Sequence, residues 1–596
     1  MKNTNAFVFF YFLISSNLKL TLLLKLAKIL NCQKFWFGRK HLRSQTKIEP
    51  RKLADLLSVR VSGSQELGGR RMIRPLCVGV DGGTTATKAA AYDPAGKLIV
   101  AGDSFGGYPI LGDGIGSSEQ LIEQIIPAVY GALRDLTNRL FRGGYTRQDL
   151  LAGAMAATFQ MHTSVPLDEQ YRPVRDRVIL WNNANGGDLV AMMIEQLGLE
   201  AVIRLTNNHP TPGYSLFHNL LVKRSDPDLW SKARHIGLLN SLFAFWLTGR
   251  HALNWNDAAG TLAFDVAHGC WSKEVADWSG ISAEFWPEVV APDACIGKIR
   301  GIEAETGIPD GMRLYGGLGD CAAGALGSGV VLPGQACGIL GTAGIFVVPT
   351  EQLVVDLKGG GRVQSYGFVE GLSHLLSTNL SAGACIEQLR RLVLGLKPDE
   401  EVAEADLNAR LSLATLDAMA SEVPFGKNGV MVDTRYAGER TGEPGWNPQA
   451  RGRWQGLSPS TSLGEIHLAL MMGVAFQQML HYRICVGYDG VTMDDITLMG
   501  GGTKSPFYTA LLTAGLKALN PKLVVRKLGA GQGGGARGMA LLAGKGAGLI
   551  TDLAKVAGDV ERGEPITTQH PSQGLDMVQP MADQFQRWLE ECYALQ

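Results

Sequence analysis

Two stretches of this sequence share one layout, in which a short apolar strand, a turn of glycine and threonine, and a second apolar strand follow one another. The first runs from Cys77 to Tyr92 and turns at Gly82-Gly83-Thr84-Thr85. The second runs from Ile339 to Val348 and turns at Gly341-Thr342-Ala343-Gly344. Because such an echo repeats a whole structural unit, it predicts two similar halves that face a common cleft.

The first turn has residue types that suit phosphate. Glycines between two strands let backbone N–H groups and hydroxyls face one point, where phosphate oxygens can bind. Asp81, at the end of the preceding strand, is placed to hold a hydrated Mg2+ near those phosphates. The alternative is an ordinary β-hairpin whose glycines only make the turn. The stretch is not a Walker A loop, because the Gly-Lys-Ser/Thr ending is missing, and it is not a G-x-G-x-x-G fingerprint.

Size, charge and cysteine content limit the class of protein. A chain of 596 residues is long enough for two or more domains. Lys plus Arg and Asp plus Glu both number 56, so net charge does not indicate a nucleic acid or an anionic membrane as partner. The nine cysteines show no C-x-x-C or Cys/His spacing. They predict reduced, buried thiols in a cytosolic protein, with neither a zinc site nor a disulfide framework.

The first 71 residues precede all of these features. Residues Ala6 to Leu30 are strongly apolar, but three lysines interrupt them, so there is no run of about 18 apolar residues. A signal anchor or an organelle-targeting leader is one interpretation. We favour another, in which translation begins at Met72, directly ahead of the first core strand, and a chain that starts there is soluble and fully active.

Polar side chains follow two strands expected in the first half. The buried strand Leu151–Thr158 leads to Gln160-Met161-His162, and the strand Val178–Trp181 leads to the amide-rich run Asn182–Asp188, which includes Asn183. Open α/β sheets bind ligands outside the carboxyl ends of their strands, and amides can bind sugar hydroxyls as donors and acceptors. The alternative is that these side chains cap loops and form turns, which is the commoner use of such amides.

Asp320 stands between an expected strand, Arg313–Gly319, and the small-residue helix that it begins. At a helix start, the unsatisfied N–H groups and the helix dipole favour the ionised carboxylate. An ionised carboxylate at the end of a strand is placed to accept a proton from a substrate hydroxyl. The alternative is that Asp320 only caps the helix.

Periodicity and turn residues predict the remaining elements. We expect helices over 118–141, 188–199, 216–224, 238–247, 383–394, 399–416, 465–482, 505–519, 538–549 and 581–595, and strands over 97–101, 429–436 and 496–499. Asn254–Thr261 is predicted to be a polar loop. The one-letter codes of Phe105–Tyr108 match the acronym of a protein family by chance, and we draw no conclusion from them. The last helix is expected to pack on the core, with a dimer contact as the alternative.

Seven pieces of the sequence matter for their order along the chain. They are Asp81–Lys88, Gln160–His162, Asn256–Thr261, Gly317–Gly324, Gly341–Gly344, Gly438–Thr441 with Trp446–Gly452, and Gly500–Ser505. Taken together, they resemble the FGGY carbohydrate kinases, the family of xylulokinase and glycerol kinase, over about Leu76 to Gly548. Two features depart from that pattern. Family members commonly carry Asp and Arg where this chain has Asn183 and Asn185, and a more acidic loop where it has Gly529–Gly535.

The resemblance implies an ATP-dependent transfer of the γ-phosphoryl group to a hydroxyl of a free sugar or polyol, with ATP and Mg2+ as cofactors. Asp320 matches the catalytic base and Asp81 the carboxylate near Mg2+. The matching phosphate and nucleotide positions are Gly83, Thr84, Thr85, Lys88, Gly341, Thr342, Gly500, Gly501, Gly502 and Ser505. The matching substrate positions, together with Asp320, are Gln160, Met161, His162 and Asn183.

The architecture implied is α/β, a two-domain actin-like ATPase (ribonuclease H-like) fold with the active site in the interdomain cleft. We expect a leader over 1–71, a sugar-side domain over 72–329, a nucleotide-side domain over 330–548 and a helical tail over 549–596. The expected partner is a small sugar or polyol, most like xylulose, in the cytoplasm, with no nucleic acid, no membrane and a homodimer as an option. Two alternatives stay open: a glycerol- or erythritol-type polyol kinase, and an actin-like ATPase or nucleotide-binding protein without a sugar acceptor.

Overall fold

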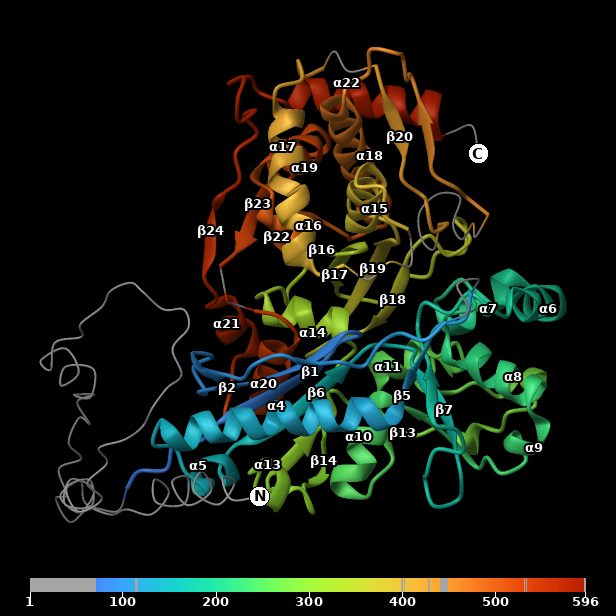
Figure 1. Ribbon diagram of the computed structural model, residues 1–596. Coiled ribbons are helices and arrows are strands. Elements are labelled where there is room, and N and C mark those ends of the chain that lie inside the picture. Colours follow the sequence, from blue (N-terminus) through green and yellow to red (C-terminus); the bar gives the residue numbers. More distant parts are fainter. Residues whose placement is uncertain are drawn as a thin grey trace, which may run out of the picture. The chain divides into compact units, whose positions relative to one another are not determined.

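The part of the chain that the structure describes contains two seven-stranded mixed sheets, one for each of the two hairpins (Figure 1). This computed structural model describes residues 71–112, 116–397, 400, 402–426, 429–439, 447, 449–529, 531 and 533–593. Residues 72 to 596 form one unit. The leader and parts of the Gly438–Gly452 and Gly529–Gly535 pieces lie outside the described residues.

The first sheet holds the first hairpin. Its strands are β1 (Cys77–Gly82), β2 (Ala86–Tyr92), β3 (Leu98–Ala101), β4 (Phe105–Gly106), β6 (Ala154–Phe159), β14 (Cys295–Lys298) and β15 (Arg313–Tyr315). They follow the order β14-β15-β6-β1-β2-β3, and β4 also pairs with β2. β1 is antiparallel to β2, which places Asp81 opposite Lys88, and parallel to β6, which places Asp81 opposite Thr158.

The second sheet repeats this pattern around the second hairpin. Its strands, in spatial order, are β18 (Gln364–Gly367), β19 (Ser373–Asn379), β17 (Gly344–Thr350), β16 (Gly334–Leu340), β22 (Met493–Met499), β23 (Val524–Leu528) and β24 (Arg562–Pro565). β16 is antiparallel to β17 and parallel to β22, as β1 is to β2 and β6. The hairpin layout that is repeated in the sequence is therefore confirmed as a repeated strand topology.

Helix α20 (Gly535–Gly546) follows the second sheet's β23 in sequence but packs on the first sheet. The approach is so close that a Cβ on Gly79 of β1 would lie 1.7 Å from the carbonyl oxygen of Ala536. α20 also packs against α14 (Asp320–Gly327), where a Cβ on Gly538 would lie 2.0 Å from the carbonyl oxygen of Ala323. The helix expected over 538–549 is confirmed as α20, and its small residues allow this close packing. The packing brings Gly535 to the end of β1.

Most of the helices that follow α14 in the chain lie beside the second sheet. They are α15 (Gly383–Val393), α16 (Glu404–Arg410), α17 (Leu413–Ser421), α18 (Leu463–Cys485), α19 (Pro506–Leu519) and α22 (Val578–Arg587), whereas α21 (Leu553–Gly558) packs on α20. α18 begins with a capping box of Ser462 and Glu465. Trp588, just after α22, is fully buried, and its indole N–H donates to the carbonyl oxygen of Val432 over 2.8 Å. The last helix therefore packs on the core, as expected.

The remaining elements form smaller groups beside the two large sheets. A four-stranded sheet has the order β5 (Glu119–Leu121), β8 (Arg177–Ile179), β7 (Ser164–Leu167), β9 (His235–Leu238). Three strand pairs are β10 (Ala252–Asn254) with β13 (Glu288–Val290), β11 (Phe264–Asp265) with β12 (Cys270–Trp271), and β20 (Met431–Asp433) with β21 (Arg453–Gln455). The helices are α4 (Ile122–Arg142), α5 (Arg147–Leu151), α6 (Gly187–Leu197), α7 (Leu199–Thr206), α8 (Ser215–Ser225), α9 (Pro227–Trp230), α10 (Leu239–Thr248), α11 (Trp255–Ala259), α12 (Lys273–Ser279) and α13 (Glu303–Thr306).

Four local predictions are wrong. Residues 119–121, taken as the start of a helix, pair with β8 as a strand, and 399–416 is not one helix but contains α16 and the start of α17. The predicted polar loop at Asn254–Thr261 contains α11, because the Asn254 side chain caps it by accepting the N–H of Asp257. Cys270 and Cys295 are exposed, so buried thiols describe only part of the cysteines.

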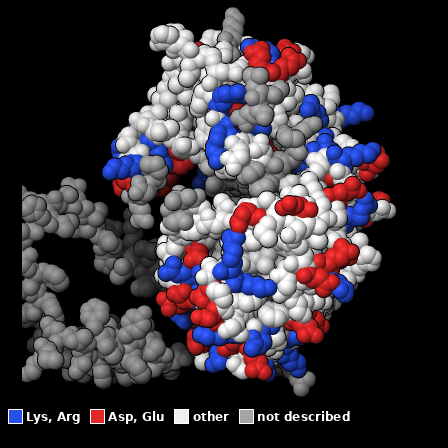
Figure 2. All heavy atoms as spheres, turned by 90° about the vertical axis from the view of Figure 1, so that its right-hand side faces the viewer, with Lys and Arg blue, Asp and Glu red and all other residues white. Residues whose placement is uncertain are grey.

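The surface agrees with the balanced charge of the sequence. On the face shown in Figure 2, Lys and Arg side chains are interspersed with Asp and Glu side chains among the described residues. None of the helices in the described ranges combines the length and the apolar character that a membrane span requires.

Candidate functional site

Side chains from three other segments hold the first turn in shape. The hydroxyl of Tyr108 donates to the carbonyl oxygen of Gly83 over 3.0 Å, and Nε2 of Gln120 donates to that of Thr84 over 2.6 Å. The indole N–H of Trp181 donates to the hydroxyl oxygen of Thr84 over 3.2 Å. The turn therefore has its shape before any ligand arrives.

Charged and hydroxyl groups border this turn. Thr85 and Lys88 are exposed, whereas Asp81 is partly buried. Burial raises the pKa of the Asp81 carboxyl, while the charge of Lys88 and the backbone N–H of Gly535 act in the opposite direction. Gly535 leaves no room for a side chain, since a Cβ there would lie 2.8 Å from Cγ of Asp81. The hydroxyl of Thr158, opposite Asp81, is buried without a hydrogen-bond partner in the described residues.

Asp320 is the first residue of α14, and Gly319 is the N-cap. Its Oδ1 accepts the N–H of Cys321 over 2.9 Å. Burial nevertheless raises the pKa of Asp320 to about 6, and the negative charge of Asp81 adds to the rise. The expectation that the helix start favours the ionised form is wrong in its net direction, because the loss of water around the carboxylate outweighs the N–H groups.

Met161 lies against Gly319, the residue before Asp320, and His162 lies against Gly260. A Cβ on Gly319 would lie 2.5 Å from Sδ of Met161, and a Cβ on Gly260 would lie 2.9 Å from Cε1 of His162. Nδ1 of His162 donates to the carbonyl oxygen of Gly260. The φ of His162 is 64°, a conformation that non-glycine residues rarely adopt and that clusters at functional sites. The structure thus brings the predicted sugar-contacting pair to the Asp320 turn.

Gln160 and Asn183 occupy different surroundings. Nε2 of Gln160 donates to Oε1 of Gln120 over 2.8 Å, while its own Oε1 is buried without a partner in the described residues. Gln160 therefore supports the first turn through Gln120. Asn183 is also buried, and its Nδ2 donates to the carbonyl oxygen of Asn185 over 3.0 Å. Asn183 thus uses this N–H within its own loop.

Backbone groups at the start of α15 hold the second turn. The N–H groups of Ala382 and Ala384 donate to the carbonyl oxygen of Thr342 over 3.0 and 3.1 Å. The N–H of Gly383 donates to the carbonyl oxygen of Gly341 over 3.0 Å. Thr342 itself is exposed.

Gly500 to Gly502 lie against the strand that leads into the second turn. A Cβ on Gly500 would lie 2.6 Å from the carbonyl oxygen of Leu340, and a Cβ on Gly502 would lie 2.9 Å from Cβ of Leu340. The φ of Gly500 is 96°, which also favours glycine. Ser505 is the N-cap of α19, where its hydroxyl accepts the N–H of Tyr508 over 3.0 Å. The strip and the second turn are therefore neighbours, and the Ser505 hydroxyl serves the helix.

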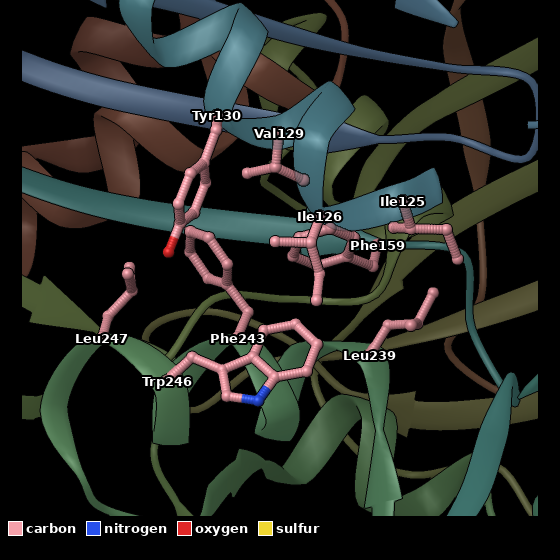
Figure 3. Close-up of a pocket in the computed structure, with 9 residues that line it drawn as sticks. All are labelled: Ile125, Ile126, Val129, Tyr130, Phe159, Leu239, Phe243, Trp246 and Leu247. Atoms are coloured by element: carbon pink, nitrogen blue, oxygen red, sulfur yellow. The ribbon is translucent and has the colours of Figure 1, made fainter. Parts of the chain in front are cut away.

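A pocket between α4 and α10 lies apart from these polar groups (Figure 3). It is lined by Ile125, Ile126, Val129, Tyr130, Phe159, Leu239, Phe243, Trp246 and Leu247. Its volume of about 10 Å3 leaves room for at most one water molecule, and its lining is apolar. A hydroxylated ligand does not fit there.

Two family models match the chain. The N-terminal domain of the FGGY family of carbohydrate kinases matches residues 76–327, and the C-terminal domain of the same family matches residues 336–547. The chain belongs to the FGGY family of carbohydrate kinases. This FGGY kinase is an ATP-dependent sugar kinase with the two-domain actin-like ATPase fold that its sequence predicts.

Individual relatives agree with the family. The FGGY kinase is 27% identical to the xylulose kinase of Bacillus subtilis over 482 residues, which cover 80% of this chain and 90% of the relative. The solved structure of xylulose kinase from Rhodospirillum rubrum has a TM-score of 0.73 at 22% identity and covers 87% of this chain and 99% of that one. Glycerol kinase of Plasmodium falciparum, solved with ADP, has a TM-score of 0.71 at 16% identity and covers 87% of this chain and 98% of that one.

The residues at the end of β1 fit a hydrated Mg2+. Asp81 and Asp320 are close enough for the charge of one to raise the pKa of the other, and the unpartnered hydroxyl of Thr158 lies beside Asp81. Mg2+ binds through one or two carboxylates, waters and substrate phosphates, so the absence of a cluster of three His, Cys, Asp or Glu residues in the described ranges does not conflict with this fit.

Sequence analysis of the FGGY kinase missed several residues that shape the site. Tyr108 lies in Phe105–Tyr108, from which we draw no conclusion in the sequence. Gln120 lies where the sequence predicts a helix. Asp257 is fully buried, and its carboxylate accepts N–H groups of Asn254 and Asn240. Burial raises the pKa of Asp257 to about 7, and those hydrogen bonds only partly offset the effect. The Asn256–Thr261 piece could have directed attention to Asp257, but no sequence signal marks Gln120.

Proposed function

We propose that this FGGY kinase phosphorylates a hydroxyl of a free ketose similar to xylulose, in the cytoplasm, with Asp320 as the catalytic base. One observation carries the proposal: the Met161–His162 pair and Asp81 both lie at the Asp320 turn, from two directions. A carboxylate between a sugar-contacting pair and a phosphate turn is what transfer to a hydroxyl requires. The name of the Bacillus subtilis relative supports the choice of ketose.

Asp320 accepts the proton of the attacking hydroxyl in this mechanism. The raised pKa, about 6, makes Asp320 a stronger base than an exposed aspartate while it stays mostly ionised at neutral pH. Met161 and His162 orient the sugar, because Met161 lies against the residue that precedes Asp320 and His162 is its neighbour in the chain. The buried Oε1 of Gln160 is available as a further acceptor for a sugar hydroxyl.

The two turns hold the nucleotide. In the first turn, Thr84, Thr85 and Lys88 would bind phosphate oxygens, and Asp81 would hold Mg2+ near them. In the second, Gly341 and Thr342 face the phosphates, and the strip from Gly500 to Gly502 lies beside the adenosine. Bound Mg2+ supplies neutralisation of phosphate charge, and the chain supplies position and exclusion of water.

The test is a phosphorylation screen with purified protein. D-xylulose, other free ketoses, glycerol and erythritol are each incubated with MgATP, and ADP release and the phosphorylated product are measured. We expect the highest kcat/KM with a ketose. A preference for glycerol or erythritol would instead identify a polyol kinase on the same fold. ATP hydrolysis that no sugar or polyol changes would identify an ATPase without a sugar acceptor and refute the proposal.

A further inference from the structure

Asn256 joins the backbone before Asp320 to the second sheet. Its side chain is fully buried in α11, and both ends of its carboxamide are used. Oδ1 accepts the N–H of Gly319, the residue before Asp320, over 3.0 Å. Nδ2 donates to the carbonyl oxygen of Gly367, the last residue of β18, over 2.8 Å. One side chain thus connects the turn that carries the catalytic carboxylate with an edge strand of the other sheet.

A second polar bridge reaches β18 from the sugar side. Oδ1 of Asn208 accepts hydroxyl protons from both Tyr214, over 3.0 Å, and Tyr366 of β18, over 2.8 Å. Nε2 of Gln364, also in β18, donates to the hydroxyl oxygen of Tyr214. The Tyr214 ring in turn meets the His162 ring edge-on, with 4.9 Å between the ring centroids. β18 is therefore bonded both to the Asp320 turn and to the residue that supports His162.

The side chains of both bridges are buried, and the bond from Asn256 to Gly367 is partly buried, so water has limited access to these hydrogen bonds. Asn208, Tyr214, Asn256, Tyr366 and Gln364 are all between 0% and 2% exposed. Breaking a buried bond of this kind leaves a donor or an acceptor without a partner, which costs more than the bond itself contributes. Such bonds hold a defined relative position of the groups that they join, which general apolar contact does not.

We propose that Asn256 is a positioning residue, which orients Asp320 for proton acceptance only while β18 is held against the sugar side of the site. The proposal rests on the proposed function, because it assigns Asn256 to the reaction in which Asp320 is the base. Asparagine suits this position because it accepts and donates through one rigid group. Aspartate would retain the acceptor for Gly319 and lose the donor to Gly367, and alanine would lose both.

Kinetics of Asn256→Ala and Asn256→Asp test the proposal, at pH 8.5 so that the carboxylates stay ionised. We expect kcat to fall about 10- to 100-fold in Asn256→Ala, since a small displacement of a catalytic group has effects of that order. Asn256→Asp should also lower kcat, because its carboxylate would face the carbonyl oxygen of Gly367 without an N–H between them. The Kd of ATP, measured by calorimetry, and the KM of the sugar should stay within about twofold in both.

A matched control separates positioning from stability. The carboxamide of Gln573, an exposed residue, also bonds backbone groups at both ends, accepting from Phe425 and donating to Val423 and Ser421. Gln573→Ala should lower Tm without changing kcat. If Asn256→Ala lowers Tm but retains the kcat of the wild-type protein, Asn256 is only structural and the proposal is overturned.

Hydrogen exchange provides a readout that does not depend on the reaction. Asn256→Asp should leave exchange at Gly319 unchanged and speed exchange across β18, whereas Asn256→Ala should speed both. Unchanged exchange in β18 in both variants would overturn the tie to the second sheet, even if the wild-type protein phosphorylates sugars. A wild-type protein without kinase activity would refute the proposed function, and the exchange data would still decide whether Asn256 makes the tie.

Discussion

The two hairpin turns have the same layout but are held in different ways. Side chains hold the first, through Tyr108, Gln120 and Trp181, and carboxylates stand beside it. Backbone N–H groups at the start of α15 hold the second, where Gly383 approaches Gly341 closely. The difference teaches that two copies of one backbone layout can serve two different tasks. The first turn has the charges that act on the reaction, and the second has the close backbone approach that suits a nucleotide.

The largest expected effect comes from removing the negative charge of Asp320, the carboxylate that interacts with Asp81 beside the first turn. Asp320→Asn should lose about 10²- to 10⁴-fold in kcat, because the amide cannot accept the hydroxyl proton. The Kd of ATP, measured by calorimetry, should change little, since the carboxylate acts on the acceptor. Turnover close to that of the wild-type protein would remove Asp320 from the proposed mechanism.

The pH dependence of kcat/KM also tests the role of the Asp320 carboxylate. Since the pKa of Asp320 is raised to about 6, the carboxylate is a base above pH 6 and is protonated below it. We expect kcat/KM for the sugar, at saturating MgATP, to fall about tenfold per pH unit below 6 and to be flat above 7. A profile that stays flat from pH 5 to pH 8 would contradict the assignment of Asp320.

The backbone support of the second turn is tested by adding one methyl group. A Cβ on Gly383 would lie 2.5 Å from the carbonyl oxygen of Gly341, so Gly383→Ala must displace the turn. We expect the KM of ATP to rise roughly tenfold, with the KM of the sugar unchanged. The control is Gly187→Ala, at the first residue of α6, where no heavy atom lies within 4 Å. Equal effects on both KM values would break the comparison between the turns.

Removing one bond from the side-chain support of the first turn should have a smaller effect. Tyr108→Phe deletes the hydrogen bond to Gly83, together with the one between the Tyr108 and Thr87 hydroxyls, and should reduce kcat/KM by about fivefold or less. Tyr508→Phe is the control, because the hydroxyl of Tyr508 is buried without a partner in the described residues. A larger loss in Tyr508→Phe than in Tyr108→Phe would show that the bond to Gly83 does not matter.

The smallest expected effect is on stability, at Asp257. The folded pKa of about 7 lies above the ordinary value of 3.8, so the folded state retains a proton that the unfolded state loses. Stability therefore falls as pH rises from about 4 to 7. Asp257→Asn removes this loss, so it should raise Tm more at pH 8 than at pH 5, by thermal unfolding. Equal shifts at both pH values would contradict the raised pKa.

Local pattern was sufficient for the parts of the fold that depend on neighbours in the sequence. The two hairpins, the strand before Gln160 and the helices α15 and α18 all follow from alternation, periodicity and turn chemistry. Local pattern failed at residues 119–121, where pairing with β8 overrides the tendency to form helix. It also failed at Asn254–Thr261, where a single cap bond was enough to start α11.

The sequence by itself determined which chemical groups this protein has: two glycine turns, the carboxylates Asp81 and Asp320, and the Met161–His162 pair. Only the tertiary structure decided how those groups are supported and how they titrate. Gln120 reaches Thr84 from 36 residues away, and Asn256 reaches Gly367 from 111 residues away. The reason is physical, because a pKa and a buried hydrogen bond depend on everything packed around a group, whereas sequence pattern records only the neighbours along the chain.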